Sequence, residues 1–431
     1  MTLRRIGDIL AMKTEAGPVL GFHSRNLEVA ELSEQAWEAA TSPDSESEAL
    51  TELKNWSKEE SSEVKSGKIS FGIRSITLNV TQVCNLACTY CAAGGDGTYG
   101  DPVKKISVEK TLPQIKFLLA KVPKGEFFHL NFLGGEPLLY PEAIEMIANY
   151  AQEIANEREI ELKFVITTNG TLLTQKNIDM LVRIKCHVNV SLDGPPEIND
   201  RVRPGFGGKP MTAKVVEGLK DLVARKRELG TVGVSAVFDA QNLEVEKAYD
   251  FLSTLNLDYV ELNFSHTETN PEANQRFMDE FKAVAAKAWA RGGEKELRKI
   301  KTFENYFRQL DSQQRVENFC GAGKSYLMID ARNQMYTCPW LVGDKTEIVG
   351  VGETFFESKL KPYEDQLVES NQCGGCWARY MCGGGCMYIH KNATGSKNQV
   401  DPEFCKRSRF TIAVSLLYYH QSRAVAQMAM A

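Results

Sequence analysis

The sequence lacks long hydrophobic runs and a strong excess of charge of either sign. The longest apolar stretch near the C-terminus, Phe410 to Tyr419, is about half of the roughly 20 residues that a membrane-spanning helix needs. No sustained apolar segment precedes Lys13, so we expect no signal peptide. A net charge of -5, from 51 basic and 56 acidic residues, gives no electrostatic reason to expect a nucleic-acid or membrane partner. These absences predict a cytoplasmic protein.

Histidine is also scarce, and its six residues are scattered without a His-Glu-x-x-His pattern, which argues against a zinc peptidase. The segment "GAGKS" (Gly321 to Ser325) imitates the end of a phosphate-binding loop. Such a loop needs an earlier glycine where Asn318 stands, and it needs a preceding strand. We therefore expect no nucleoside triphosphate site.

Cysteine, in contrast, is plentiful, with eleven residues. In a reducing compartment cysteines are more often metal ligands than disulfide partners. Cys186 precedes an apolar segment and is expected to be a small buried hydrophobe. The other ten form two groups: Cys84, Cys88 and Cys91, and then Cys320, Cys338, Cys373, Cys376, Cys382, Cys386 and Cys405.

Strand and helix patterns alternate from about Ser70 to Phe264. This alternation predicts parallel strands joined by right-handed helical crossovers. Six units are too few for a complete eight-stranded barrel, which leaves a partial barrel or an open sheet. The fold class we predict is α/β, with a partial (β/α)6 TIM-like barrel. The expected strands are Ser75 to Val80, Phe128 to Leu133, Lys163 to Thr168, His187 to Leu192, Gly233 to Phe238 and Tyr259 to Phe264.

Polar or glycine-rich motifs follow the first four of these strands. Cys84 comes after the first, "GGEP" (Gly134 to Pro137) after the second, "TNG" (Thr168 to Gly170) after the third, and "SLDG" (Ser191 to Gly194) ends the fourth. The carboxyl ends of parallel strands meet at one rim, where such folds place their functional residues. We therefore expect these motifs to lie together.

The first cysteine group could hold three irons of a cubic 4Fe-4S cluster. No fourth cysteine or histidine stands nearby, so the fourth iron would be left for a small molecule. Glycines in "AAGGDG", directly after Cys91, would let the loop fold closely around a cluster. The alternative is a structural zinc site completed by a distant residue, because such sites normally have four protein ligands.

The Cys-x3-Cys-x2-Cys spacing, with Tyr90 before its last cysteine, resembles the signature of radical S-adenosylmethionine (SAM) enzymes. The "GGEP" segment is similar to that family's motif for the methionine amino group of SAM. The resemblance covers about Ser70 to Phe264. It implies a cluster that binds and reductively cleaves SAM, so that a 5'-deoxyadenosyl radical removes a hydrogen atom from an unactivated carbon.

The resemblance also implies which residues bind the cofactor. Tyr90 is expected near the adenine, and Ser191 and Arg203 near the methionine carboxylate. Asn169 and Asp193 have an alternative reading as simple turn residues. The full expected set is Tyr90, Gly134, Gly135, Glu136, Pro137, Thr168, Asn169, Ser191, Asp193 and Arg203.

The second cysteine group resembles the SPASM extension of radical SAM enzymes, which holds auxiliary iron-sulfur clusters. By this resemblance Cys373, Cys376, Cys382 and Cys405 bind one 4Fe-4S cluster, and Cys320, Cys338 and Cys386 bind another without a cysteine in its fourth position. The total is three 4Fe-4S clusters. A zinc ribbon is the alternative.

Three features depart from the SPASM pattern. Cys320 and Cys338 are somewhat farther apart than usual. Asn333 occupies a turn position where glycine is common, although asparagine tolerates positive φ. Pro339 and Trp340 follow Cys338, where sulfatase-maturing relatives carry an aspartate that is thought to act as a base.

Four domains are expected: a peptide-recognition module (1–45) that resembles small winged-helix modules, a linker (46–69) with one possible short helix, the radical SAM partial barrel (70–310) and a SPASM domain (311–431). The alternative for the first is a simple structural appendage. In this first segment, Val19 to Ser24 and Leu27 to Leu32 are strand candidates, and Ser33 is expected to cap a helix.

The resemblance therefore predicts a maturase of a ribosomal precursor peptide that carries a leader sequence. It would install a thioether or carbon-carbon crosslink, with flavodoxin or ferredoxin as electron donor. One alternative is a protein maturase of the anaerobic sulfatase or amine dehydrogenase type. Another is a non-catalytic zinc or iron-sulfur scaffold.

Overall fold

The computed structural model describes all residues except 15–16, 42–46, 70, 92–102, 104 and 431, and the side chains of 426–430. The expected glycine-rich loop after Cys91 lies outside the described residues. The chain forms two compact units. The barrel unit consists of Ser70–Glu280 and Gly321–Glu364, and the terminal unit of Met1–Ile69, Phe281–Cys320 and Asp365–Ala431. Each unit combines segments that are distant in the sequence, so the unit boundaries differ from those of the four expected domains.

The barrel unit contains one ten-stranded sheet, whose first six strands lie in chain order. All neighbours among these six are parallel, as expected. Each of the six predicted strands is present, with ends within two residues of the prediction. They are β5 (Ser75–Thr81), β6 (Phe127–Gly134), β7 (Glu161–Thr168), β8 (His187–Ser191), β9 (Val232–Phe238) and β10 (Tyr259–Phe264).

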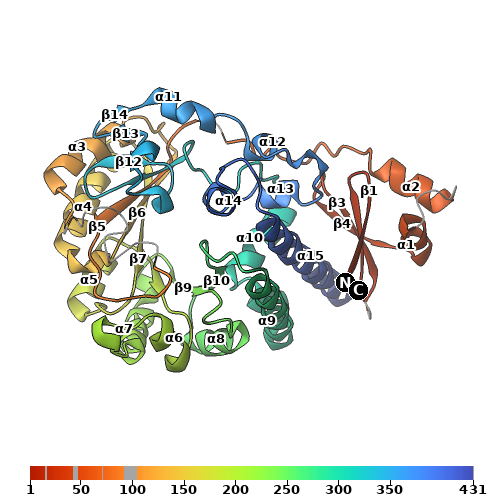
Figure 1. The fold of residues 1–431 in the computed structure, drawn as a ribbon, viewed down its shortest axis with the longest axis horizontal. Coiled ribbons are helices and arrows are strands. Elements are labelled where there is room, and N and C mark those ends of the chain that lie inside the picture. Colours follow the sequence, from red (N-terminus) through yellow and green to blue (C-terminus); the bar gives the residue numbers. More distant parts are fainter. Residues whose placement is uncertain (15–16, 42–46, 70, 92–102, 104, 431) are drawn as a thin grey trace. The chain divides into compact units, whose positions relative to one another are not determined.

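Helices follow these strands and cover the outer face of the curved sheet (Figure 1). The face of β6 that carries Phe128, Leu130 and Phe132 is buried, while the residues between them are largely half-buried. This alternation places the apolar core between the sheet and the helices. The helices are α3 (Val108–Leu119), α4 (Pro141–Glu157), α5 (Gln175–Arg183), α6 (Pro196–Val202), α7 (Thr212–Ala224) and α8 (Val245–Leu252). After β10, α9 (Pro271–Leu297) begins in the barrel unit and ends in the terminal unit.

Four short strands that the sequence analysis missed extend the sheet beyond β5. The first of them, β11 (Tyr326–Ile329), runs parallel to β5 and pairs Leu327 with Ile76. The other three are antiparallel to their neighbours. Asn333 turns the chain between β11 and β12 with a φ of 63°, so its expected tolerance of positive φ is confirmed. The remaining elements are β12 (Gln334–Tyr336), β13 (Gly350–Val351), β14 (Thr354–Phe355) and α11 (Glu357–Leu360).

The terminal unit begins with a four-stranded antiparallel sheet in chain order. Both expected strands are present, and the Ser33 hydroxyl accepts the Ala36 N–H at 3.1 Å, which confirms the cap of the first helix. The first two strands were not expected. The elements are β1 (Thr2–Ile6), β2 (Ile9–Lys13), β3 (Val19–His23), β4 (Glu28–Leu32) and α1 (Glu34–Thr41).

A second helix, α2 (Glu48–Trp56), lies in the segment that was expected to be a linker. Its side chains Leu53 and Trp56 pack with Ile9 and Ala11 of β2. Residues 48–56 therefore belong to the core of the N-terminal module. The sequence indicated one possible short helix here, but the Ser, Glu and Lys residues on both sides favoured a linker.

The other face of the N-terminal sheet packs against the C-terminal segment of the chain. Phe22 is fully buried and meets the Trp377 ring edge-on, with ring centroids 6.3 Å apart. Leu10 and Leu20 share this apolar cluster with Ile412. The first and last parts of the chain thus form one core. The helices of this unit are α10 (Lys301–Ser312), α12 (Leu367–Ser370), α13 (Arg379–Cys382), α14 (Met387–Thr394) and α15 (Pro402–Met430).

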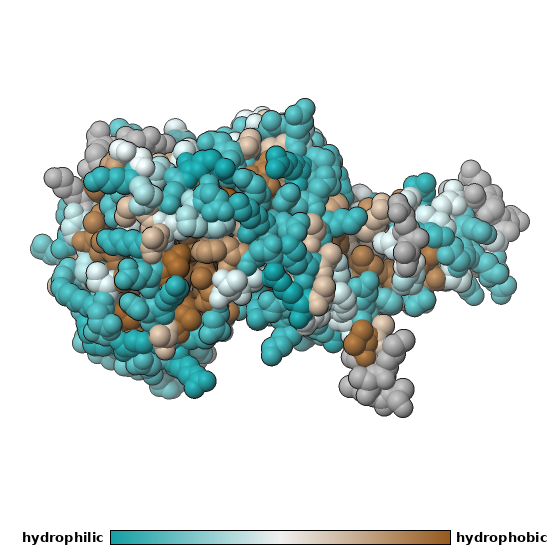
Figure 2. Space-filling view, turned by 90° about the horizontal axis from the view of Figure 1, so that it is seen from below, coloured by the Kyte–Doolittle hydropathy of each residue, from teal (hydrophilic) through white to brown (hydrophobic). Residues whose placement is uncertain are grey.

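Among the described residues, no helix is long and apolar enough to cross a membrane. The face drawn in Figure 2 is largely hydrophilic, with apolar side chains in smaller patches.

We expect Phe22→Ala to destabilise the protein by about 3–5 kcal/mol, because it leaves a cavity in the shared core of the terminal unit. Thermal unfolding followed by circular dichroism measures the effect. The matched control is Phe206→Ala, since Phe206 is 59% exposed. Equal losses of stability in the two variants would contradict the packing described here.

Candidate functional site

The loop that carries the first three cysteines is anchored by backbone hydrogen bonds. It follows β5 and lies against the segment after α6. The Ala87 N–H donates to the Pro204 carbonyl at 2.8 Å, and the Thr89 N–H donates to the Val202 carbonyl at 2.9 Å. Leu86 forms a further bridge with Gly205. The loop is thus fixed at the carboxyl rim of the sheet.

The two glycines of "GGEP" approach the start of this loop closely. The Gly135 N–H donates to the Thr81 carbonyl at 2.8 Å, and the Glu136 N–H donates to the Val83 carbonyl at 3.0 Å. A Cβ atom on Gly135 would lie 2.2 Å from the Val83 oxygen, and one on Gly134 would lie 2.3 Å from the Thr81 oxygen. Only glycine fits at either position.

The Glu136 side chain is fully buried and ties the end of β6 to that of β7. One carboxylate oxygen accepts the Thr168 hydroxyl at 2.7 Å and the Leu138 N–H at 2.9 Å. The other oxygen accepts the Asn169 N–H at 2.7 Å. Burial raises the pKa of Glu136, and these donors act in the opposite direction. Pro137 begins a short 3-10 helix directly after it.

Asn169 connects β7 with the first cysteine. Its side-chain amide donates to the Cys84 sulfur at 3.5 Å and to the Asn85 oxygen at 2.8 Å. Its own oxygen accepts both the N–H and the hydroxyl of Thr171. Gly170, with a φ of 77°, does form a turn as the alternative interpretation expected. The Asn169 side chain, however, contacts the loop that carries Cys84. Sequence reasoning missed Asn85, which lies directly after Cys84.

Tyr90, Asp193 and Arg203 form a second buried group at the same rim. The Tyr90 hydroxyl donates to the Asp193 carboxylate and accepts a hydrogen bond from Arg203 at 2.7 Å. The guanidinium lies 5.9 Å from the centroid of the Tyr90 ring. Asp193 also accepts a hydrogen bond from the Val237 N–H of β9 at 3.0 Å. A residue that served only a local turn would not need this contact. Burial raises the pKa of Asp193, and the charge of Arg203 opposes that rise.

The remaining expected residues lie nearby in the same unit. Ser191 ends β8 and pairs in register with Ser235 of β9. Burial raises the pKa of the Cys88 thiol to about 11, and the charge of Arg203 lowers it. Burial also raises the pKa of Cys84.

Three thiols on one short loop suit a 4Fe-4S cluster. Cluster irons bind thiolate sulfur, and both the Arg203 cation and the Asn169 amide favour the thiolate form of a neighbouring cysteine. The structure therefore brings together the cysteine loop, "GGEP" and Asn169, and it places Tyr90, Asp193 and Arg203 beside them.

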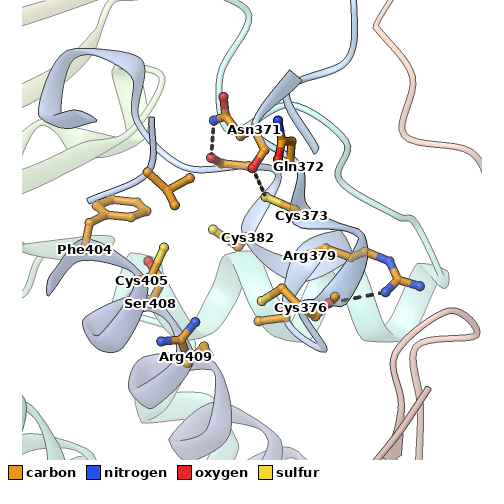
Figure 3. A pocket seen from close by; sticks show the side chains of 14 residues that line it. Asn371, Gln372, Cys373, Cys376, Arg379, Cys382, Phe404, Cys405, Ser408 and Arg409 are labelled. Carbon is orange, nitrogen blue, oxygen red and sulfur yellow. Dashed lines mark hydrogen bonds between the residues drawn. The ribbon is translucent and has the colours of Figure 1, made fainter. Parts of the chain in front are cut away.

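Four cysteines of the second group line a single cavity of about 230 Å³ in the terminal unit. Cys373, Cys376 and Cys382 come from the 373–382 loop, and Cys405 comes from α15 (Figure 3). Burial and neighbouring thiols raise the pKa of Cys373 to about 11 and that of Cys382 to about 12. Four cysteine sulfurs around one cavity are the type of ligand set that an iron-sulfur cluster uses. Among the described residues, however, no group of three or more His, Cys, Asp or Glu side chains is already arranged to hold a metal ion.

The other three cysteines of this group are divided between the units. Cys320 lies close enough to Cys386 to raise its pKa, although burial is the larger cause. Cys338 belongs to the barrel unit and precedes Pro339. Trp340 stacks on His266, with ring centroids 4.6 Å apart. This stacked pair was not foreseen from the sequence. Cys186 is fully buried, as expected.

Comparison with known proteins now identifies the chemistry of this rim. Residues 78–252 match the model of the Radical SAM superfamily. This segment of the chain is a radical SAM domain. It runs from β5 to α8, and it contains the cysteine loop, "GGEP" and the Tyr90 group. A non-catalytic scaffold is therefore not supported.

Curated proteins to which this chain is similar include maturases. Mycofactocin maturase MftC of Mycobacterium ulcerans (strain Agy99) is 26% identical over 337 residues, which cover 72% of this chain and 82% of the relative. The serine-type anaerobic sulfatase-maturating enzyme of Klebsiella aerogenes is 24% identical over 334 residues, which cover 73% and 79%.

Solved structures support the fold of this chain. The enzyme anSMEcpe with bound AdoMet has a TM-score of 0.66 at 18% identity, covering 80% of this chain and 98% of that chain. SuiB of Streptococcus suis, bound to precursor peptide SuiA, has a TM-score of 0.53 at 14% identity, covering 94% and 100%. At these identities the likeness establishes the fold alone.

We expect Gly135→Ala to displace the Val83 to Cys84 backbone, because its Cβ would lie within contact distance of both residues. Iron bound by the first cysteine group and SAM cleavage should both fall sharply. Gly125→Ala is the matched control in the same unit, since no atom lies within 4 Å of a Cβ there; its positive φ should cost about 1 kcal/mol. Iron content and 5'-deoxyadenosine release measure the outcome. Wild-type values for Gly135→Ala would refute the close approach.

Proposed function

We propose that this radical SAM enzyme is a maturase of a ribosomal precursor peptide and installs a thioether or carbon-carbon crosslink. Two cysteine sites in one chain support this proposal. The first is the three-cysteine loop at the barrel rim, and the second is the cavity lined by four cysteines, which packs against the N-terminal sheet. The resemblance of the chain to mycofactocin maturase agrees with it.

The rim residues are assigned to cluster and SAM binding. Cys84, Cys88 and Cys91 would hold a 4Fe-4S cluster whose fourth iron binds SAM. When bound, this pair supplies a 5'-deoxyadenosyl radical that takes a hydrogen atom from a substrate carbon. Asn169 orients the Cys84 sulfur, and Glu136 fixes Asn169 through its backbone N–H.

The other rim residues are assigned to the rest of SAM. The Arg203 guanidinium is held in place by Tyr90, and the cation lies where it could attract a carboxylate. Ser191 and Thr168 would line the same pocket. Asp193 fixes the Tyr90 ring near the adenine by accepting its hydroxyl proton in a hydrogen bond.

The second cysteine group is assigned to two auxiliary 4Fe-4S clusters. Cys373, Cys376, Cys382 and Cys405 would hold the first in the cavity of the terminal unit. Cys320, Cys338 and Cys386 would hold the second, with its fourth ligand unassigned. Bond formation on a peptide radical releases one electron and one proton, and the auxiliary clusters would accept that electron. Flavodoxin or ferredoxin would supply the reducing electron.

The N-terminal sheet is assigned to the leader of the peptide. Its edge strands are β1 and β4, and an exposed edge can accept a peptide as an added strand. The fold likeness to SuiB, which was solved with its precursor peptide, is consistent with this assignment.

A sulfatase-type maturase is the second candidate, favoured by the resemblance to the Klebsiella enzyme. A protein maturase of the amine dehydrogenase type is a variant of this second candidate. Trp340 and its stacked partner His266 occupy the region that follows Cys338. They provide no carboxylate where sulfatase-maturing relatives carry an aspartate, and we therefore rank this candidate second.

Replacing Cys84, Cys88 and Cys91 together with alanine should abolish SAM cleavage, because it removes every protein ligand of the first cluster. The protein is reconstituted anaerobically and 5'-deoxyadenosine is measured by chromatography. Cys186→Ala is the matched control and should retain cleavage, since Cys186 is a core residue. If the triple variant still cleaved SAM, the cluster assignment would be wrong.

The peptide product should lose two hydrogen atoms for each crosslink. Mass spectrometry of a candidate precursor peptide, encoded beside this gene, measures the loss. A crosslink also suppresses fragment ions between the joined residues. An alcohol side chain that lost two hydrogen atoms without a crosslink would gain a carbonyl group. Reaction of the product with a hydrazide probe would then favour the sulfatase-type candidate instead.

A further inference from the structure

The cavity lined by Cys373, Cys376, Cys382 and Cys405 is not built by the C-terminal segment alone. Cys376 and Cys382 pack against the same apolar cluster as Phe22 of the N-terminal sheet. Trp377, between these cysteines, provides the edge-on ring contact to Phe22. The 373–382 loop therefore packs directly against the N-terminal sheet.

A polar contact joins the same two segments. Arg379 has a side chain that is only 7% exposed, and its guanidinium donates to the Asp8 carboxylate at 2.9 Å. The same guanidinium donates to the Gly374 carbonyl at 2.7 Å and to the Cys376 carbonyl at 3.4 Å. One side chain thus holds two carbonyls of the cysteine loop and one carboxylate of the N-terminal module (Figure 3 shows Arg379 beside this loop).

Asp8 is itself held firmly in the turn between β1 and β2. Its carboxylate also accepts Arg25 at 2.7 Å and the Ser24 hydroxyl at 3.2 Å. Its backbone N–H donates to the Ser57 hydroxyl at 2.7 Å. From the neighbouring strand, Arg5 donates to the Gly375 carbonyl. The N-terminal module thus contacts Gly375 directly, and it reaches Gly374 through Arg379.

We propose that Asp8 and Arg379 are a positioning pair, through which the N-terminal module fixes the backbone and the charge balance of the auxiliary cluster site. This inference rests on the proposed assignment of the four cysteines to a cluster. Arg379 draws the loop carbonyls toward itself, and Asp8 balances its charge. Without Asp8, Arg379 would remain as a buried and less compensated cation beside the cluster.

The charge argument gives a prediction of sign. A reduced cluster carries one more negative charge than an oxidised cluster, so an uncompensated cation nearby favours reduction. Asp8→Asn should therefore raise the reduction potential of the auxiliary cluster. Arg379→Gln removes the cation and should lower it. Loss of rigidity alone has no reason to move the two variants in opposite directions.

The test uses a full-length parent chain in which the proposed ligands of both other clusters are alanine, so that the remaining iron belongs to the cavity beside Arg379. The replaced residues are Cys84, Cys88, Cys91, Cys320, Cys338 and Cys386. Potentiometric titration followed by electron paramagnetic resonance gives the potential, and a colorimetric assay gives iron per chain. Asp8→Glu keeps the charge and should restore the parent value. Glu34→Gln makes the same charge change in the same module, on a side chain that is 65% exposed and paired with Lys13, and should leave the potential unchanged.

Opposite shifts for Asp8→Asn and Arg379→Gln, with restoration by Asp8→Glu, would support the pair. Shifts of the same sign, or none in either variant, would overturn it even if both variants unfold at lower temperature. A parent chain that binds no iron would also overturn it. That result would place the failure in the cluster assignment of the proposed function, whereas an iron-loaded parent with unresponsive variants would place it in Asp8 and Arg379.

Discussion

The rim site depends on the close approach of Gly134 and Gly135 to the backbone between Thr81 and Cys84. Two N–H groups of "GGEP" donate to carbonyls of the cysteine loop, and no Cβ fits between the segments. This contact fixes where the first cysteine lies relative to β6. Glu136 then carries the constraint to β7 through Asn169, whose amide meets Cys84. Contacts from the ends of β5, β6 and β7 therefore fix the position of the Cys84 thiol.

The order of the strands and the convergence of the motifs could be predicted because both follow from local signals. Apolar alternation marked the six parallel strands, and the rule that strand ends share a rim placed Cys84, "GGEP" and "TNG" together. The same rule could not show the pairing of Leu86 with Gly205, because that bridge joins segments more than a hundred residues apart without a periodic pattern. Asn85 was missed because a single polar residue beside a cysteine carries no distinctive signal.

The parts of the chain outside the six parallel strands were harder to foresee, since their elements are short and their contacts are long-range. The strands β11 to β14 have two to four residues each and join the sheet next to β5. The polar flanks of the helix α2 favoured a linker, yet its buried side chains complete the N-terminal core. Asp8 and Arg379 are separated by 371 positions, and neither residue type suggests the other. Cysteine spacing revealed the second cysteine group but not the sheet on which its loop rests.

The shared core of the terminal unit has a consequence for biosynthesis. Ribosomes produce the N-terminal sheet first, and its apolar side chains Leu20 and Phe22 need partners such as Trp377 and Ile412. Those partners emerge only after the whole barrel has been translated. One face of the N-terminal sheet therefore stays uncovered until then. The cavity lined by four cysteines of the second group cannot form until α15 has left the exit tunnel. Under the proposed cluster assignment, insertion of iron at this cavity would be a late, post-translational event, whereas the first cysteine loop can be complete much earlier.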